Sequence, residues 1–149
     1  MKVVIQRVLN ASLSIDQRVY SSIGKGYLLL VSFTNGDNEE NSKKMAEKIS
    51  KLRIFDDENG KTNLSIFDVN GEILSVSQFT LYANLRKGNR PSFIDALIPS
   101  EADKLYNYFN ECLKELNLPP KTGVFGADMK INLINDGPFT VILDSKELF

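Results

Sequence analysis

The sequence predicts an α+β fold whose strands pair mostly antiparallel. Three features of the chain indicate this class. Hairpin signals dominate the first third, helical periodicity occurs in two segments, and strands and helices do not alternate in the regular β-α-β order of a parallel sheet. With 149 residues, 42% of them hydrophobic, the chain is long enough to bury a core. We therefore expect a single domain over residues 1–149, with about seven short strands and two main helices.

The first third of the chain predicts three strands. Residues 2–9 are mostly aliphatic, and the strand continues to residue 15 with hydrophobic and serine residues in alternation. Asp16 and Gln17 form a tight turn, so residues 19–23 return as a hairpin partner. Residues 27–33 are nearly all apolar, which is typical of a central strand that is buried on both faces.

Two later segments predict helices. The first covers residues 39–52, with polar residues at 37–38 that can cap it and charges that suit its dipole. The second covers roughly residues 101–117, where Ser100 and Asp103 resemble a capping pair. Each has a hydrophobic stripe at helical spacing: Met45, Ile49 and Leu52 in the first, and Leu105, Phe109, Cys112, Leu113 and Leu116 in the second.

Short apolar segments bounded by turn residues predict the remaining strands, at 54–55, 73–76, 129–134 and 139–143. Gly137 and Pro138 should bend the chain between the last two of these strands. Residues 63–70 are ambiguous, and the Asn70–Gly71 dipeptide that ends them is a strong turn signal.

Composition limits the chemistry that the chain can perform. It contains no histidine, which removes the commonest general base and excludes a Ser-His-Asp or Cys-His apparatus. The single cysteine, Cys112, excludes an internal disulfide framework and lies on a helical stripe, so we expect it in the core. No acidic cluster has metal-ligand spacing. No apolar run approaches the ~20 residues of a membrane span, and we expect a cytoplasmic protein without cofactor or metal.

Residues 77–81 (SQFTL) place polar side chains directly after an apolar strand. Buried polar groups cost free energy unless they form hydrogen bonds, so this segment is either a satisfied strand end or the wall of a site. In a continuing strand, Gln78 and Thr80 would share one face, and Ser77 and Phe79 the other. A nucleophilic hydroxyl here would need an activating base, and no histidine can serve.

A second candidate wall lies at residues 135–140 (NDGPFT). From residue frequencies alone, the Gly137–Pro138 bond would be an ordinary trans turn. Proline here directly precedes a predicted strand, however, and two polar residues precede the dipeptide. A bend held by strands on both sides would be rigid and would expose backbone carbonyl groups.

Arg86, Lys87 and Arg90 lie close together in a glycine-containing segment. Such a loop is ordinarily solvated, and phosphate contact is the alternative. Because the formal net charge of the chain is -1, a nucleic acid would be held locally by this loop and not by the field of the whole protein.

Together these segments resemble the D-aminoacyl-tRNA deacylase family. The likeness rests on SQFTL and NDGPFT in this order and covers the whole chain. It includes flanking segments at residues 4–8, 52–55, 86–88, 90–93 and 122–127, and Met129. The resemblance implies a barrel-like core and a homodimer with its active sites at the interface. It also implies hydrolysis of the ester that joins a D-amino acid, or glycine, to the 3′ end of tRNA, while L-aminoacyl-tRNA is spared.

The resemblance also implies roles for individual residues. Ser77, Gln78, Phe79 and Thr80 would line the catalytic pocket, where backbone N–H groups stabilise the oxyanion and the tRNA 2′-hydroxyl assists. A cis Gly137–Pro138 bond would reach into the partner's pocket as a chirality filter. The remaining assignments are Arg7 as a brace for that bond, Phe125 and Met129 for the terminal adenosine, and Arg86, Lys87 and Arg90 for tRNA.

One position departs from the family pattern, and two other functions remain open. Phe139 stands where the family usually has valine, so the shape of the pocket is expected to differ. The chain could instead be a nucleic-acid-binding module without catalysis. It could also be a general small-ester hydrolase with Thr80 as nucleophile, which the lack of a side-chain base disfavours.

Overall fold

A six-stranded sheet, a separate two-stranded sheet and three α-helices make up the computed structural model, which describes residues 1–149. The strands are β1 (Lys2–Ile15), β2 (Arg18–Ile23), β3 (Gly26–Ser32), β4 (Arg53–Asp56), β5 (Thr62–Ser65), β6 (Glu72–Ser77), β7 (Lys121–Thr122) and β8 (Lys130–Asp144). The helices are α1 (Glu39–Ser50), α2 (Pro99–Glu115), α3 (Ser145–Leu148) and the short 3₁₀ helix η1 (Phe79–Tyr82). The predicted α+β class is confirmed.

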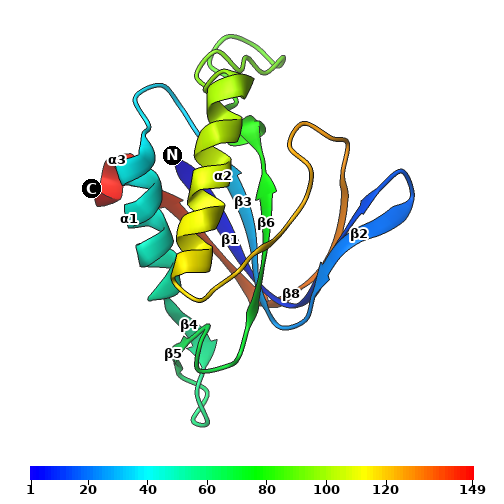
Figure 1. Cartoon of the computed structure of the whole chain (residues 1–149), viewed down its shortest axis with the longest axis vertical. Helices are drawn as coiled ribbons and strands as arrows, with labels where there is room; N and C mark the ends of the chain where they lie inside the picture. The colour runs from blue at the N-terminus through cyan, green and yellow to red at the C-terminus, as the bar shows by residue number, and fades with distance from the viewer.

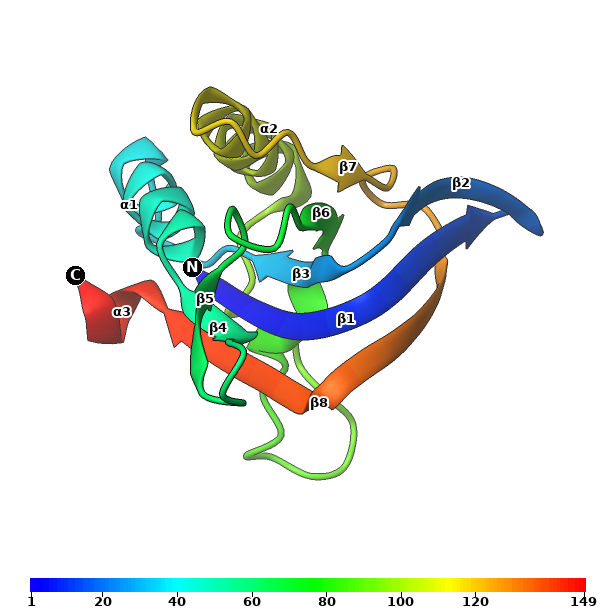
Figure 2. The same cartoon turned by 90° about the horizontal axis from the view of Figure 1, so that it is seen from below.

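The large sheet has the strand order β2-β1-β3-β6-β7, and β8 pairs with the other side of β1. The long strands β1 and β8 curve along their length, so the sheet is barrel-like (Figure 2). β1 pairs antiparallel with β2, as the hairpin signal at Asp16 and Gln17 predicts, and it also pairs antiparallel with β3 and β8. The pairs β3–β6 and β6–β7 are parallel, which local sequence did not indicate. β6 follows β3 only after α1 and the β4–β5 sheet, and this long connection permits the parallel pairing.

β3 is the central strand, as its apolar sequence predicts. α1 and α2 cover one face of the sheet (Figure 1), where Tyr27, Leu29 and Val31 join a core of 21 buried residues. Leu28 points to the opposite face and joins a smaller core with residues of β1, β2 and β6. Since successive strand residues point to opposite faces, a strand with cores on both sides must be apolar throughout.

Both predicted helices form, with small shifts at their ends. α1 begins at Glu39, and the side chain of Asn38 caps it by accepting a hydrogen bond from the Asn41 N–H at 3.0 Å. α2 begins at Pro99, and its first turn has no side-chain cap, so the predicted Ser100–Asp103 capping pair is wrong. Proline at the first helical position has a suitable φ and needs no N–H partner, which explains the earlier start.

The predicted last two strands are one continuous strand, β8, with the Gly137–Pro138 dipeptide inside it. Of the ambiguous residues 63–70, the first three belong to β5 and the rest form turns. None of the helices is both long and apolar enough to span a bilayer.

Candidate functional site

The first polar segment lies where β6 ends. Ser77 is the last residue of β6 and pairs with Val31, and the Gln78 N–H donates to the Val31 carbonyl at 2.8 Å. The chain then turns into η1, so the predicted alternation of faces through Thr80 is wrong. In a 3₁₀ turn, successive side chains are about 120° apart and do not alternate between two faces. Gln78 and Thr80 are nevertheless joined by a direct hydrogen bond.

That hydrogen bond runs from Gln78 Nε2 to Thr80 Oγ1 at 2.5 Å, so the Thr80 hydroxyl contacts an amide and not a base. Phe79 is 56% exposed, and its ring meets that of Phe93 edge to face at 4.9 Å. Within η1, the first backbone N–H to form a hydrogen bond is that of Leu81, which donates to the Gln78 carbonyl at 3.3 Å. The Phe79 and Thr80 N–H groups precede it, at the end of a helix where N–H groups have no intrahelical acceptor.

Phe125 and Met129 lie on the segment that follows β7. β7 runs parallel to β6, and their pairing ends with Thr122 beside Ser75. The Phe125 ring is 6.2 Å from that of Tyr106, whose hydroxyl donates to the Ser75 carbonyl at 2.8 Å. Met129 packs on the smaller core instead, so the structure places these two residues on one segment but on different clusters.

Two tyrosines lie near the end of β6: Tyr106 is buried, and Tyr82, at the end of η1, is half-buried. Burial raises the pKa of Tyr106, and burial raises the pKa of Tyr82 as well, with Asp37 and Asp144 adding to the shift. Both hydroxyls therefore stay protonated at neutral pH. Since the chain has no histidine, neither residue type supplies a general base beside η1.

The second polar segment forms a bulge in β8. Gln6 pairs with Thr140, and Val8 pairs with Asn135. On β1 only Arg7 lies between these two positions, whereas on β8 the four residues 136–139 lie between them. The Gly137–Pro138 peptide bond is cis, and both residues are exposed. The backbone of these four residues cannot follow the regular ladder, so its polar groups need other partners.

Arg7 holds the start of this bulge. It is 4% exposed, its Nε donates to the Asp136 carbonyl at 2.9 Å, and its Nη1 donates to the Ile54 carbonyl at 2.8 Å. Its charge is matched by Asp136 at 3.4 Å and Asp56 at 3.2 Å. The guanidinium also lies over the Phe139 ring, 4.8 Å from its centroid, in a cation–π contact.

The sequence does not predict the ion pair between Arg7 and Asp56. Arg7 and Asp56 are far apart in the chain, and such a pairing leaves no signal in the local sequence.

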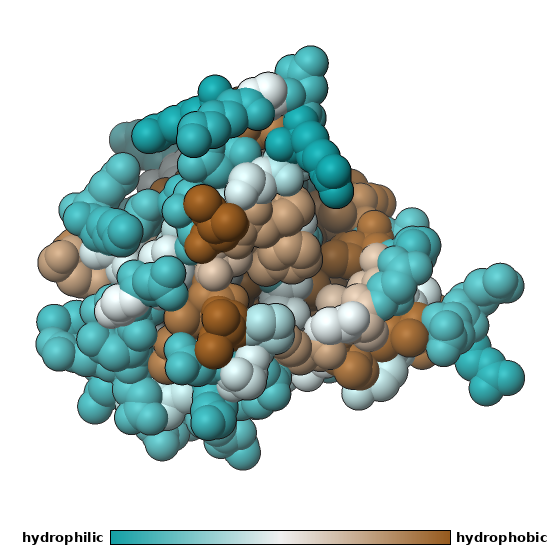
Figure 3. Space-filling view, turned by 90° about the horizontal axis from the view of Figure 1, so that it is seen from above, coloured by the Kyte–Doolittle hydropathy of each residue, from teal (hydrophilic) through white to brown (hydrophobic).

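The basic residues Arg86, Lys87 and Arg90 are all exposed, in a loop whose ends are joined by the Asn84–Ser92 bridge. In Figure 1 this loop lies beyond the N-terminal end of α2. Figure 3 shows the molecule from above that view, and this face of the molecule carries hydrophobic areas among hydrophilic side chains. An open pocket of about 380 Å³ connects the loop with η1. Lys2, Tyr82 and Arg86 line it, and the Lys2 ammonium lies 5.0 Å from the centroid of the Tyr82 ring.

The two polar segments are far apart within one chain. Ser77 is level with Val31 and thereby with Val3 of β1, whereas the bulge lies opposite Arg7. Four residues along a strand span about 13 Å, and the three strand spacings from β6 to β8 span about 14 Å. One chain therefore does not bring the two walls together around a single amino acid.

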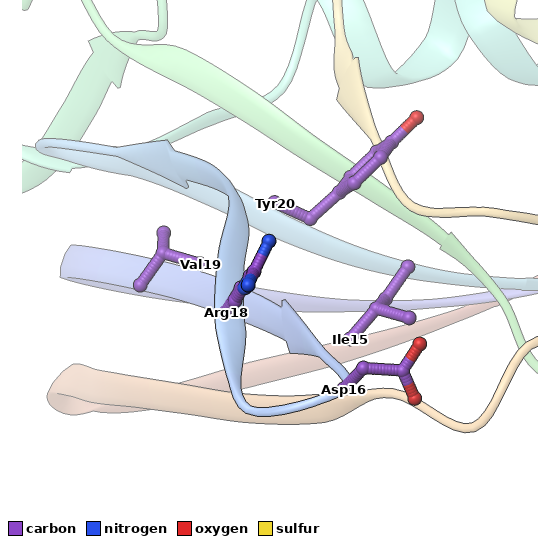
Figure 4. Close-up of a pocket in the computed structure, with 5 residues that line it drawn as sticks. All are labelled: Ile15, Asp16, Arg18, Val19 and Tyr20. Atoms are coloured by element: carbon purple, nitrogen blue, oxygen red, sulfur yellow. The ribbon is translucent and has the colours of Figure 1, made fainter.

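A larger open pocket of about 590 Å³ lies at the tip of the β1–β2 hairpin (Figure 4). Its lining residues, from Ile15 to Tyr20, include none of the predicted site residues. No group of three or more Cys, Asp or Glu side chains is arranged to hold a metal ion.

Comparisons with known proteins give one family over nearly the whole chain. Residues 4–144 match the family model described as D-Tyr-tRNA(Tyr) deacylase. A Lactobacillus acidophilus protein named D-aminoacyl-tRNA deacylase is 58% identical over 97% of this chain and 99% of its own length. A Thermosipho africanus protein of the same name is 52% identical over the full length of both chains.

Two solved structures share the fold. One, named c-Myc DNA Unwinding Element Binding Protein, has a TM-score of 0.91 and 41% identity, covering 97% of this chain and 98% of that one. The other, described as a probable eukaryotic D-amino acid tRNA deacylase, has a TM-score of 0.82, covering 95% and 97%. Its identity of 16% supports the shared fold alone.

Proposed function

The chain belongs to the D-Tyr-tRNA(Tyr) deacylase family and is a hydrolase of the aminoacyl-tRNA ester bond, and we propose that it proofreads chirality. Its substrates are D-aminoacyl-tRNAs, together with glycine mischarged on non-cognate tRNA. The products are the free amino acid and tRNA. The family match over nearly the whole chain is the observation that carries this proposal.

The working enzyme is a homodimer with two sites at its interface. This proposal rests on the separation of segments 77–80 and 137–138 within one chain. In a dimer, one copy can supply segment 77–80 and the other copy segment 137–138 of the same site. β8 supports this assembly, because it pairs only with β1 and leaves the other edge of a 15-residue strand open. Long open edges readily pair with another chain. Ile134 and Ile142 of this strand are also exposed.

Catalysis depends on backbone groups and on the substrate itself. Water adds to the ester carbonyl, the backbone N–H groups of Phe79 and Thr80 stabilise the resulting oxyanion, and the 3′-oxygen leaves as a hydroxyl of tRNA. The neighbouring 2′-hydroxyl of the terminal ribose assists this step. Ser77, Gln78 and the Thr80 hydroxyl shape the pocket, in keeping with the contact of Thr80 to an amide.

Stereoselection depends on the backbone of Gly137 and Pro138, which reaches into the pocket of the other subunit. A filter that rejects one enantiomer by collision needs a wall that does not yield, and buried Arg7 supports this wall. Phe125 and Met129 hold the terminal adenosine. Arg86, Lys87 and Arg90 contact the phosphates of the tRNA, consistent with their exposure beside η1.

The first prediction concerns substrate stereochemistry. In a metal-free buffer, the protein should deacylate D-tyrosyl-tRNA while L-tyrosyl-tRNA survives, because only the L side chain meets the Gly137–Pro138 wall. Release of labelled tyrosine from matched D- and L-charged tRNA measures both rates. Equal rates on both substrates would contradict the filter, and no release from either would contradict the deacylase activity itself.

A second candidate function is nucleic-acid binding without catalysis. One solved structure at 41% identity is named for binding to a DNA element, and the exposed basic loop could contact any phosphate backbone. The same assay separates the candidates. A module of this kind would shift the charged tRNA in a binding experiment and leave its ester intact.

A further inference from the structure

We propose that Asn135 is a positioning residue for stereoselection: its side-chain amide closes the second half of the bulge that carries Gly137 and Pro138. This inference rests on the proposed function, in which the bulge is the chirality filter. Arg7 bonds the backbone of the bulge at Asp136 and Asn135 bonds it at Phe139, so a different side chain holds the backbone at each end.

The need for such a clamp follows from the strand register. One residue of β1 lies opposite four residues of β8, so three backbone units of β8 have no counterpart on β1. Pro138 has no N–H group at all. The other backbone groups must find partners among side chains or water, because an unpaired polar group in a folded chain costs free energy.

Asn135 supplies these partners at the end of the bulge. Its Oδ1 accepts a hydrogen bond from the Phe139 N–H at 2.6 Å. Its Nδ2 donates to Thr140 Oγ1 at 3.0 Å and reaches the Phe139 carbonyl at 3.4 Å. The residue before the bulge is thus bonded to the last residue of the bulge and to the residue after it, and the segment between them becomes a closed ring.

The ring is also crowded inside, so it has little freedom to adjust. Gly137 has φ +142°, and a Cβ added to it would lie 2.9 Å from the Phe139 nitrogen and 3.3 Å from Arg7 Nη2. The Phe139 N–H that Asn135 holds is therefore the group that packs against Gly137. Release of this N–H would let residues 137–139 move and would soften the wall that rejects the L enantiomer.

The second prediction tests this role with three variants. Asn135→Ala removes all three contacts, and Asn135→Asp keeps an acceptor for the Phe139 N–H. Asn132→Ala is the matched control, since Asn132 is an exposed residue of the same strand whose side chain makes no hydrogen bond within the chain. We measure the ratio of kcat/KM for D- over L-tyrosyl-tRNA, and the hydrogen exchange of the Phe139 amide by NMR.

In Asn135→Ala the D/L ratio should fall at least tenfold, through faster hydrolysis of the L ester, and the Phe139 amide should exchange at least tenfold faster. Asn135→Asp should restore most of both values, and Asn132→Ala should match the wild type. An unchanged ratio in Asn135→Ala, or an equal fall in Asn132→Ala, overturns the inference. If Asn135→Ala does not fold, Asn135→Asp decides alone. Loss of the D/L ratio in Asn135→Asp, while its Phe139 amide exchanges at the wild-type rate, also overturns the inference.

These outcomes differ from a failure of the proposed function. If the wild-type protein hydrolyses neither ester, the deacylase activity is refuted. The exchange of the Phe139 amide still decides whether Asn135 closes the bulge.

Discussion

Thr80 shows at the level of one residue why a hydroxyl in a site need not be a nucleophile. Its Oγ1 accepts from Gln78 Nε2 at 2.5 Å, the chain has no histidine, and burial keeps the neighbouring tyrosines Tyr82 and Tyr106 protonated. Activation of a serine or threonine nucleophile requires an adjacent base. The residue is better suited to shape the turn whose backbone N–H groups are the proposed donors to the oxyanion.

The third prediction follows from this assignment. Thr80→Val keeps the shape of the side chain and removes the hydroxyl, so kcat/KM on D-tyrosyl-tRNA should stay within about tenfold of the wild type, whereas loss of a true nucleophile costs on the order of 10⁴-fold or more. Single-turnover deacylation measures the change. Ser100→Ala, at an exposed residue of α2 whose hydroxyl makes no hydrogen bond within the chain, is the control for removing a side-chain hydroxyl. A loss of a thousandfold or more with tRNA binding intact would identify Thr80 as the nucleophile.

At the level of elements, the start of β6 is joined to three neighbours. Gly26 of β3 lies so close to β6 that an added Cβ would be 1.8 Å from the Glu72 carbonyl oxygen, so only glycine fits there. The Glu72 carboxylate accepts from the Gly24 N–H at 2.7 Å and pairs with Lys121 of β7 at 2.9 Å. These contacts set the position of the strand that ends at the candidate site.

The fourth prediction concerns acid stability. The hydrogen bond from Gly24, together with Lys121, lowers the pKa of Glu72 below its ordinary value of 4.5. A carboxyl with a lowered pKa in the folded state contributes stability above its unfolded pKa and loses it as the pH falls through the folded pKa. Glu72→Gln should therefore have a lower Tm than the wild type at neutral pH.

The Tm difference should shrink as the pH falls below about 4.5, and thermal melts monitored by circular dichroism at a series of pH values measure it. Glu58→Gln, in the exposed turn after β4, is the control and should track the wild type at every pH. A Tm difference that does not change with pH would show that the Glu72 contacts are not electrostatic.

At the level of the whole molecule, the helices cover one face of the sheet, and the other face is covered only in part. The smaller core lies beneath the β1–β2 hairpin and the first half of β8. The second half of β8 leaves Ile142 68% exposed, next to an edge with no partner strand. The proposed dimer would cover this region and unite the two walls of the site.

The fifth prediction tests that assembly. Wild-type protein should sediment at about twice 16.7 kDa. Ile142→Lys places a charge on the proposed interface and should shift the protein toward the monomer, with deacylation lost in parallel. Val19→Lys changes an equally exposed residue, at 68%, on the β1–β2 hairpin and should remain dimeric and active. A fully active monomer would contradict a site shared between two copies.

Much of the fold is encoded locally. The apolar run at 27–33, the hairpin at Asp16–Gln17 and the stripes of the two helices each depend on a few neighbouring residues, and all are found in the structure. The errors are local as well. Ser77 ends its strand earlier than the alternation predicts, and Pro99 starts α2 without the predicted cap, because backbone geometry at an element's end is decided by what it packs against.

The sequence alone determined the residue types of both polar walls, the lack of a histidine base and the order of most elements. The tertiary structure decided which strands pair, that Arg7 lies opposite the Gly137–Pro138 bulge, and that the two walls are too distant to share a site within one chain. The physical reason is range. Periodicity and turn propensity act over a few residues, whereas register and pairing are set by packing between segments that are far apart in the chain.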